Sequence, residues 1–164
     1  MTAIDQYAAA HAVTVLPSAH ALIDVFDERV APASALTDAA HALACLYRGL
    51  IADPSPIDER VRERIGELEA QIDTRVRGQR TRCAGAGSRS AGAVIGALAM
   101  AWALAAWARE HLSPRDVRLH RVWSLLAWIN NFYTDVVTGD MPARWMRPPV
   151  TWDAIAAIRG ELQR

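Results

Sequence analysis

The chain has 164 residues and contains no lysine. All 18 of its basic residues are arginines. Without lysine there is no residue for a Schiff base, for pyridoxal phosphate or for a P-loop. The 18 acidic residues bring the net charge to zero. This balance argues against a general nucleic-acid-binding protein, and we expect no nucleic-acid partner. The first arginine is Arg29, so no secretory signal is predicted and a cytoplasmic location is expected.

Cysteine is scarce, and the familiar catalytic motifs are absent. Cys45 and Cys83 lie far apart and form no C-x-x-C pair, so the sequence predicts neither a disulfide framework nor a zinc site. No G-x-S-x-G, H-E-x-x-H or E-x-x-H pattern occurs, and we expect no bound metal and no redox cofactor. His41 lies four residues before Cys45, which makes a cysteine nucleophile geometrically possible, but packing within a helix is the commoner role of such a pair.

Strand patterns are missing as well, because no run of β-branched residues alternates with polar ones between turn signals. Helix start signals occur instead, in which serine or threonine precedes a first turn that contains an acid. They are Ser55-Pro56-Ile57-Asp58, Ser113-Pro114-Arg115-Asp116 and Thr151-Trp152-Asp153. The length is enough for one hydrophobic core, so we predict a single domain over residues 1–164, folded as a compact all-α bundle of six or seven helices.

The start signals and the apolar periodicity together predict seven helical ranges. These ranges are Ala3–Val13, Ser18–Val30, Ser34–Ala52, Pro56–Arg82, Ala91–His111, Pro114–Thr138 and Trp152–Gln163. The range 56–82 has one apolar stripe and charged flanks, which is typical of a helix with one buried face. The range 114–138 is apolar over most of its circumference, so we expect it at the centre of the bundle or in a dimer interface.

The most apolar segment has no charged residue between Arg89 and Arg109, which is long enough to cross a bilayer. Gly92 and Gly96 have the G-x-x-x-G spacing that lets membrane helices approach closely. Alanine dominates the segment, however, and it contributes little to membrane insertion. We therefore predict that this segment is the Ala- and Trp-rich central helix of the bundle, and not a membrane span.

Polar side chains recur on one side of the predicted helix 114–138. At 100° per residue, four of them fall within a sector of about 60°. This side is either solvated or lines a pocket, in which His120, Asn131 and Asp135 would be the catalytic acid–base and orienting groups. The expected ligand-binding residues of that pocket are Trp102, Trp107, Trp123, Ser124, Trp128 and Tyr133.

A second candidate site precedes the central helix, where arginines surround a Gly-Ala-Gly-Ser loop. A helix N-terminus beside guanidinium groups can bind a phosphate or carboxylate. The candidate anion-binding residues are Arg80, Arg82, Ser88 and Arg89, with Ser88 or Ser90 as the helix cap. The loop matches no Walker or dinucleotide-binding pattern, and a solvated helix end is the alternative.

Several short motifs resemble a bacterial all-helical family, domain of unknown function 4254, over about residues 58–148. They are His120-x-x-Trp123-x-x-Leu126-Ala127, Tyr133-x-Asp135-Val136-Val137 followed by Gly139 and a proline-rich turn, Ser90-Ala91-Gly92-Ala93-Val94-Ile95, and Ile72-Asp73. The family's N-terminal stretch of Asn, Trp and acidic residues has no match here, and Gly96 stands where a second acid is expected. The resemblance implies a helical fold and brings no established activity.

The sequence favours two hypotheses for function over a third, a membrane-embedded helix pair that would require detergent. The first is a small cytoplasmic bacterial enzyme or ligand-binding protein of specialised metabolism, with an apolar, aromatic-lined pocket, acid–base polar groups and a small-molecule ligand. The second is a protein–protein interaction module, such as an adaptor or an immunity protein, that uses an apolar helix face. Six tryptophans are hard to bury in so short a chain, so we also expect a homodimer.

Overall fold

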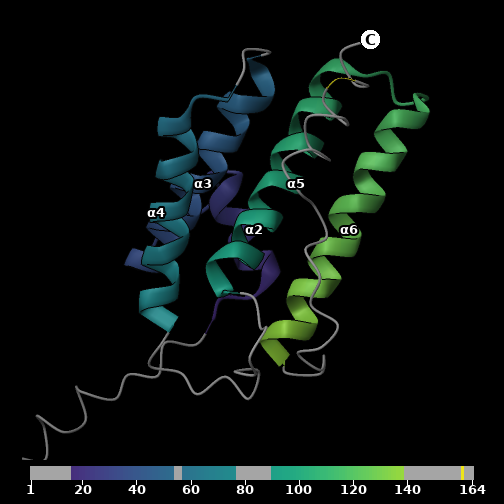
Figure 1. Cartoon of the computed structure of the whole chain (residues 1–164). Helices are drawn as coiled ribbons and strands as arrows, with labels where there is room; N and C mark the ends of the chain where they lie inside the picture. Colours follow the sequence, from purple (N-terminus) through teal and green to yellow (C-terminus); the bar gives the residue numbers. More distant parts are fainter. Residues whose placement is uncertain (1–15, 54–56, 77–89, 139–159, 161–164) are drawn as a thin grey trace, which may run out of the picture.

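Five helices make up the part of the chain that the computed structural model describes, which is residues 16–53, 57–76, 90–138 and 160. They are α2 (Ala19–Phe26), α3 (Ala35–Ala52), α4 (Glu59–Val76), α5 (Ala91–His111) and α6 (Val117–Thr138) (Figure 1). No strand occurs within these ranges, and the predicted all-α fold is confirmed. The expected helices Ala3–Val13 and Trp152–Gln163 lie outside the described residues, so a total of six or seven helices stays a prediction.

α5 is the central helix and contacts each of the other four (Figure 1). Its observed bounds are the predicted ones, and its small side chains are buried along most of its length. Small side chains let α3 and α6, its most extensive neighbours, pack closely on it. By length and composition α5 is also able to cross a membrane, and most of this apolar stretch is buried inside the bundle.

α4 buries a single face, as its periodicity predicted. Ile65, Leu68, Ile72 and Val76 are buried, and their spacing of three, four and four residues places them on one side of the helix. This side packs against α3 and α5. The charged residues of α4 lie mostly on its exposed faces, with the exceptions described below.

The starts of α4 and α6 differ from the prediction in the same way. In each Ser-Pro-x-Asp segment the helix begins after the aspartate instead of at the proline. Asp116 Oδ1 accepts the backbone N–H of Arg118 at 2.8 Å, and Asp58 Oδ1 accepts that of Arg60 at 3.2 Å. Ser113 accepts the N–H of Asp116 through its carbonyl oxygen, which forms a turn before the helix. The acid is the cap because its carboxylate pairs an N–H that the helix leaves free.

α2 ends four residues earlier than predicted, because the backbone turns back at Glu28. This residue has a φ of 58°, in the left-handed region. The N–H groups of Glu28 and Arg29 donate to the carbonyl oxygens of Val25 (3.1 Å) and Asp24 (2.9 Å), which is the pattern of a Schellman cap. Glycine is the usual residue at such a position, so a glutamate gives no sequence signal for the end of the helix.

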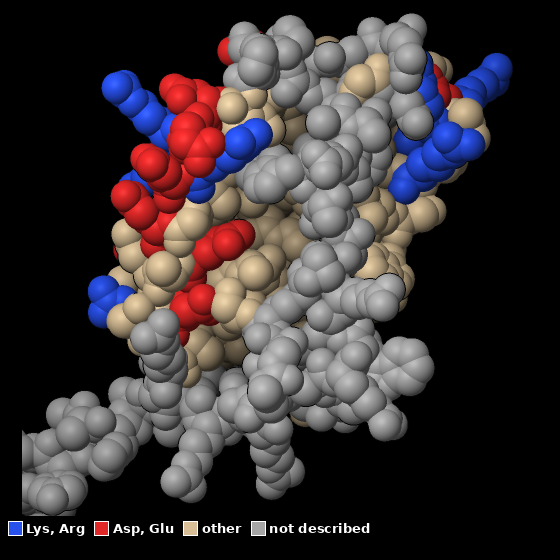
Figure 2. All heavy atoms as spheres, in the orientation of Figure 1, with Lys and Arg blue, Asp and Glu red and all other residues tan. Residues whose placement is uncertain are grey.

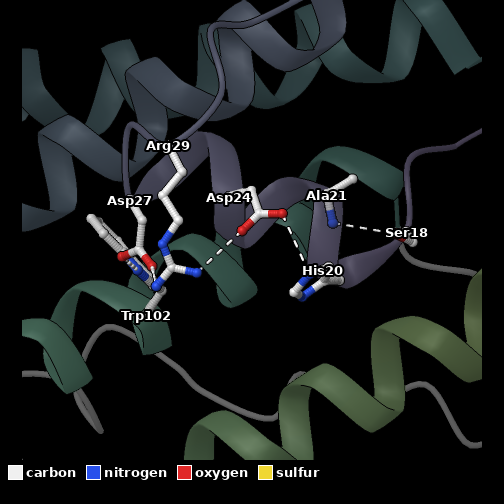
Figure 3. Close-up of polar contacts among 7 residues, drawn as sticks. All are labelled: Ser18, His20, Ala21, Asp24, Asp27, Arg29 and Trp102. Atoms are coloured by element: carbon white, nitrogen blue, oxygen red, sulfur yellow. Dashed lines mark hydrogen bonds and ion pairs between the residues drawn. The ribbon is translucent and has the colours of Figure 1, made fainter.

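The end of α2 is attached to α5 through Asp27 (Figure 3). Trp102 Nε1 donates to Asp27 Oδ1 at 2.8 Å, and Arg29 pairs with Asp27 Oδ2, also at 2.8 Å. The ring of Phe26 packs against the indole of Trp102 with centroids 5.6 Å apart. Trp102 is 6% exposed. Its indole therefore belongs to the core that joins these two helices.

α6 lies at the edge of the bundle, next to α5 (Figure 1). Its buried side chains, which form a single stripe, are Val122, Leu126, Ile129, Phe132 and Tyr133. The Tyr133 hydroxyl donates to the carbonyl oxygen of Pro17 at 2.7 Å, which ties α6 to the segment before α2. Burial raises the pKa of Tyr133, so the hydroxyl remains a donor. The other side of α6 is exposed.

Candidate functional site

α4 and α5 approach each other closely at Gly92 and Gly96. A Cβ at Gly92 would overlap the backbone of Glu69, whose carbonyl carbon would be 2.7 Å away. A Cβ at Gly96 would lie 2.6 Å from Glu69 Oε1 and 3.6 Å from the hydroxyl of Tyr47. The two glycines therefore leave the space that the backbone and the carboxylate of Glu69 occupy. Their G-x-x-x-G spacing serves a contact between two helices of this bundle.

The first turn of α5 is capped from two sides at this contact. Asp73 Oδ1 accepts the N–H of Gly92 at 2.8 Å, and Ser90 Oγ accepts the N–H of Ala93 at 3.0 Å. A negative charge at a helix N-terminus is also favoured by the helix dipole. Asp73 thus has a structural role, and it lies one turn beyond Glu69 on the same side of α4.

Glu69 is the unusual member of this cluster, because its carboxylate receives no hydrogen bond and no ion pair from the described residues. Partial burial and the nearby Asp73 carboxylate both raise the pKa of Glu69. Burial, with the charge of Glu69 as a smaller cause, raises the pKa of Tyr47. Like charges at i,i+4 destabilise a helix, so the Glu69–Asp73 pair is placed here at a cost in stability.

The visible surface beside α4 is hollowed in the view of Figure 2. Figure 2 shows acidic side chains along α4, at the edge of a hollow whose visible floor is formed largely by uncharged side chains. We call the group formed by Glu69, Asp73 and Tyr47, which lies where α4 approaches Gly96, the Glu69 recess. A half-buried carboxyl with a raised pKa can take up and release a proton closer to neutral pH than an ordinary glutamate, which suits acid–base chemistry.

A second group of reactive residues lies between α2 and α3. His41 Nε2 is 3.7 Å from Cys45 Sγ and 4.0 Å from Glu28 Oε1. Both contacts involve the same ring nitrogen, whereas a catalytic relay binds the acid and the nucleophile on opposite nitrogens. Burial and the charge of Glu28 raise the pKa of Cys45, which disfavours the thiolate. The arrangement therefore lacks the features of an activated cysteine.

The polar residues predicted to be catalytic lie on the outer side of α6. His120 and Asn131 are exposed, and Asp135 is half-buried. Ser124 is exposed too, and its hydroxyl donates to the carbonyl oxygen of His120 at 2.9 Å. The predicted common sector is therefore correct, and it faces away from the core of the described helices. A catalytic role for these residues stays a prediction.

The aromatic residues predicted to bind a ligand are divided between the core and the surface. Trp102 and Tyr133 are buried and hydrogen-bonded as described above. Trp107 is half-buried and stacks on His111, with ring centroids 4.5 Å apart. Trp123 and Trp128 are 44% and 51% exposed. The structure therefore does not gather these side chains around one space.

The predicted anion site falls largely outside the part of the chain that the structure describes. This applies to Arg80, Arg82, Ser88 and Arg89. At the described end of α5, Ser90 and Asp73 already accept two of the N–H groups that an anion would use. Among the residues described, no group of three or more His, Cys, Asp or Glu side chains is placed to hold a metal ion.

Sequence reasoning missed the three polar residues of the Glu69 recess. Glu69 and Asp73 are surrounded in the sequence by other charged residues, so they look like part of a solvated helix face. Tyr47 looks like an ordinary core aromatic, which its 5% exposure also suggests. The available signal is the pair of glycines on α5, which shows that something approaches that helix closely but does not say what.

Comparison with known proteins gives no relative from which a role could be transferred. No family model matches the chain, and neither a curated protein nor a solved structure matches it. The resemblance to domain of unknown function 4254 stays a prediction.

Proposed function

We propose that the protein binds a small molecule at the Glu69 recess, with Glu69 as the group that holds or moves a proton. The observation that carries this proposal is the Glu69 carboxylate itself. It is half-buried beside Gly96 and Tyr47, and no described residue donates to it or pairs with it. A carboxylate in such a place costs stability, and a ligand that pairs with it would recover that cost.

The chemistry of the recess favours a ligand with a cationic amine and an apolar body. An amine would pair with Glu69 and lie near Asp73, so two carboxylates would stabilise one positive charge. The uncharged side chains around the recess would contact the apolar part. If the protein is an enzyme, the same carboxyl is suited to general acid or base catalysis on the bound amine or on a neighbouring carbon.

A thermal-shift comparison tests the proposed ligand class. We expect 2-phenylethylamine to raise the Tm of the wild-type protein more than 2-phenylethanol does, because only the amine can pair with Glu69. Glu69→Gln should remove this preference for the amine. Glu63→Gln, which removes an exposed carboxylate from the same helix, should keep it. Equal shifts with the amine and the alcohol in the wild type, or an unchanged preference in Glu69→Gln, would contradict the proposal.

The raised pKa of Glu69 predicts a pH-dependent stability without any ligand. Because the pKa is higher in the folded than in the unfolded state, the folded protein holds this proton more tightly. The resulting stabilisation is present below the ordinary glutamate value of 4.5 and is lost as the pH rises through the folded-state value. Glu69→Gln cannot titrate, so its free energy of unfolding should increase relative to wild type across that window. Urea unfolding at a series of pH values measures the difference, and a constant difference would refute the assignment.

A second candidate function, a protein interaction module, is favoured by the exposed tryptophans of α6. Trp123 and Trp128 are the large aromatic side chains that the described surface leaves most open. Tryptophan is the residue type most often found as an anchor in protein interfaces. For this second function, the binding surface would lie on α6 and not on α4.

A further inference from the structure

The outer side of α6 carries a regular stripe of mostly exposed residues, of which Trp128 stacks on Phe132 of the same helix. Its members, spaced alternately by four and three residues, are Val117, Arg121, Ser124, Trp128, Asn131 and Asp135. Val117 is 63% and Trp128 51% exposed, and only Asp135 is half-buried. A spacing that averages 3.5 residues is that of a seam along which a second helix packs. We call these six residues the outer stripe.

Two opposite charges lie symmetrically on the outer stripe. Arg121 lies seven residues before Trp128, and Asp135 lies seven residues after it. Neither side chain makes an ion pair or a hydrogen bond with the described residues. The two are about 21 Å apart along the helix axis, so they are too far apart to pair within one chain.

We infer that a second copy of the chain occupies the outer stripe, with the two α6 helices antiparallel and related by a two-fold axis at Trp128. In this arrangement residues equally distant from the axis meet. Arg121 of each copy would face the partner's Asp135, so the dimer would contain two ion pairs. The two Trp128 indoles would contact each other at the axis and leave the solvent. This inference does not depend on the proposed ligand, because it concerns another helix.

The charges of the outer stripe favour a second copy over other occupants. An acidic partner would place negative charge against Asp135, and a basic partner would place positive charge against Arg121. Each would be repelled by one of the two charges. A nucleic acid or an anionic membrane would meet the same unfavourable carboxylate. Ser124 and Asn131 lie between the charges and the indole, and these polar groups suit a protein surface better than lipid chains. Only a surface with the opposite order of charges matches, and the antiparallel copy has this order.

The test is a pair of charge reversals studied by sedimentation velocity. We expect the wild type to dimerise below about 100 μM, in the range of ordinary specific interfaces. Arg121→Asp alone would set two carboxylates against each other across the interface, and Asp135→Arg alone would set two guanidinium groups together. Each variant should therefore weaken the dimer at least about tenfold. An equimolar mixture of the two variants should instead form a heterodimer of nearly wild-type affinity, because each carboxylate of the first variant then faces a guanidinium group of the second. A mixture that associates as weakly as either variant alone would contradict the proposed pairing.

In the antiparallel register, a variant that carries both charge reversals should regain the dimer affinity that each single reversal removes. A chain that carries both Arg121→Asp and Asp135→Arg again places a carboxylate opposite a guanidinium group at both ends of the interface, with the order of charges reversed. Its dimer should therefore recover most of the affinity that each single change removes. A double variant that stays as weak as the single ones would contradict the proposed pairing.

Controls separate loss of the interface from loss of folding. Trp128→Ala should weaken the dimer, whereas Trp123→Ala should leave it unchanged, since Trp123 lies about 140° away around the helix. Circular-dichroism melting of every variant establishes that the subunit remains folded. A wild type that is monomeric at about 200 μM would overturn the inference. So would single charge reversals that fold and have no effect on the dimer.

Discussion

Replacing Gly92 with alanine is expected to lower the free energy of unfolding by about 1–3 kcal/mol, because the new methyl group would overlap main-chain atoms. The overlapping atoms belong to the backbone of Glu69, with its carbonyl carbon at 2.7 Å. A side chain could rotate away from such a contact, but a helix backbone moves only if α4 as a whole shifts from α5. The shift would also open the core between the buried face of α4 and its two neighbours, and would break the bond from Gly92 to Asp73.

Two other glycines provide matched controls for Gly92. Gly66 is exposed on α4 with nothing within 4 Å of its Cβ position, so Gly66→Ala is expected to stabilise by about 0.5–1 kcal/mol through helix propensity. At Gly96 the nearest atom is the end of the Glu69 side chain, which can move aside, so Gly96→Ala should have a smaller effect than Gly92→Ala. Urea unfolding of the three variants gives the order, and equal values for Gly66 and Gly92 would contradict the close contact.

The fold could be predicted where local chemistry decides it. The bounds of α5 could be predicted from its uncharged, alanine-rich sequence. The starts of α2, α3 and α5 follow from Ser18, Ser34 and Ser90, which cap these helices through their side-chain oxygens. The end of α2 could not be predicted, because it depends on a left-handed residue, Glu28, that has no glycine to mark it. The starts of α4 and α6 were misplaced because two residues of each segment can cap a helix, and the sequence does not rank them.

The candidate site was harder to predict, for a different physical reason. Periodicity places residues on one side of a helix, and it correctly grouped the polar residues of α6. It does not say whether that side meets water, a neighbour or a ligand. For Glu69 the deciding fact is the close approach of α5, which depends on glycines more than twenty residues further along the chain. The contact therefore cannot be inferred from the pattern of charged residues within α4.

Replacing Trp102 with alanine is expected to destabilise the protein by about 3–5 kcal/mol, the largest effect among our predictions. The indole is almost fully buried, so its removal leaves a cavity between α2 and α5. Phe26 would lose the ring against which it packs, and Asp27 would lose the donor to its Oδ1 atom. Since α2 is only eight residues long, it has few other contacts with which to hold its place against α5.

Trp102→Phe separates the hydrogen bond from the packing, because phenylalanine keeps an aromatic ring but has no N–H donor. We expect this change to lower the free energy of unfolding by about 1.5–3 kcal/mol, which is the contribution of a hydrogen bond to a charged group. Trp107→Phe is the control, because Trp107 is half-buried and its indole N–H binds none of the described residues; its loss should be smaller. A double-mutant cycle of Trp102→Phe with Asp27→Ala isolates the pair, since both single changes remove the same bond. If the two losses were simply additive, the bond between Trp102 and Asp27 would contribute nothing to stability, and α2 would be held in place by its apolar contacts alone.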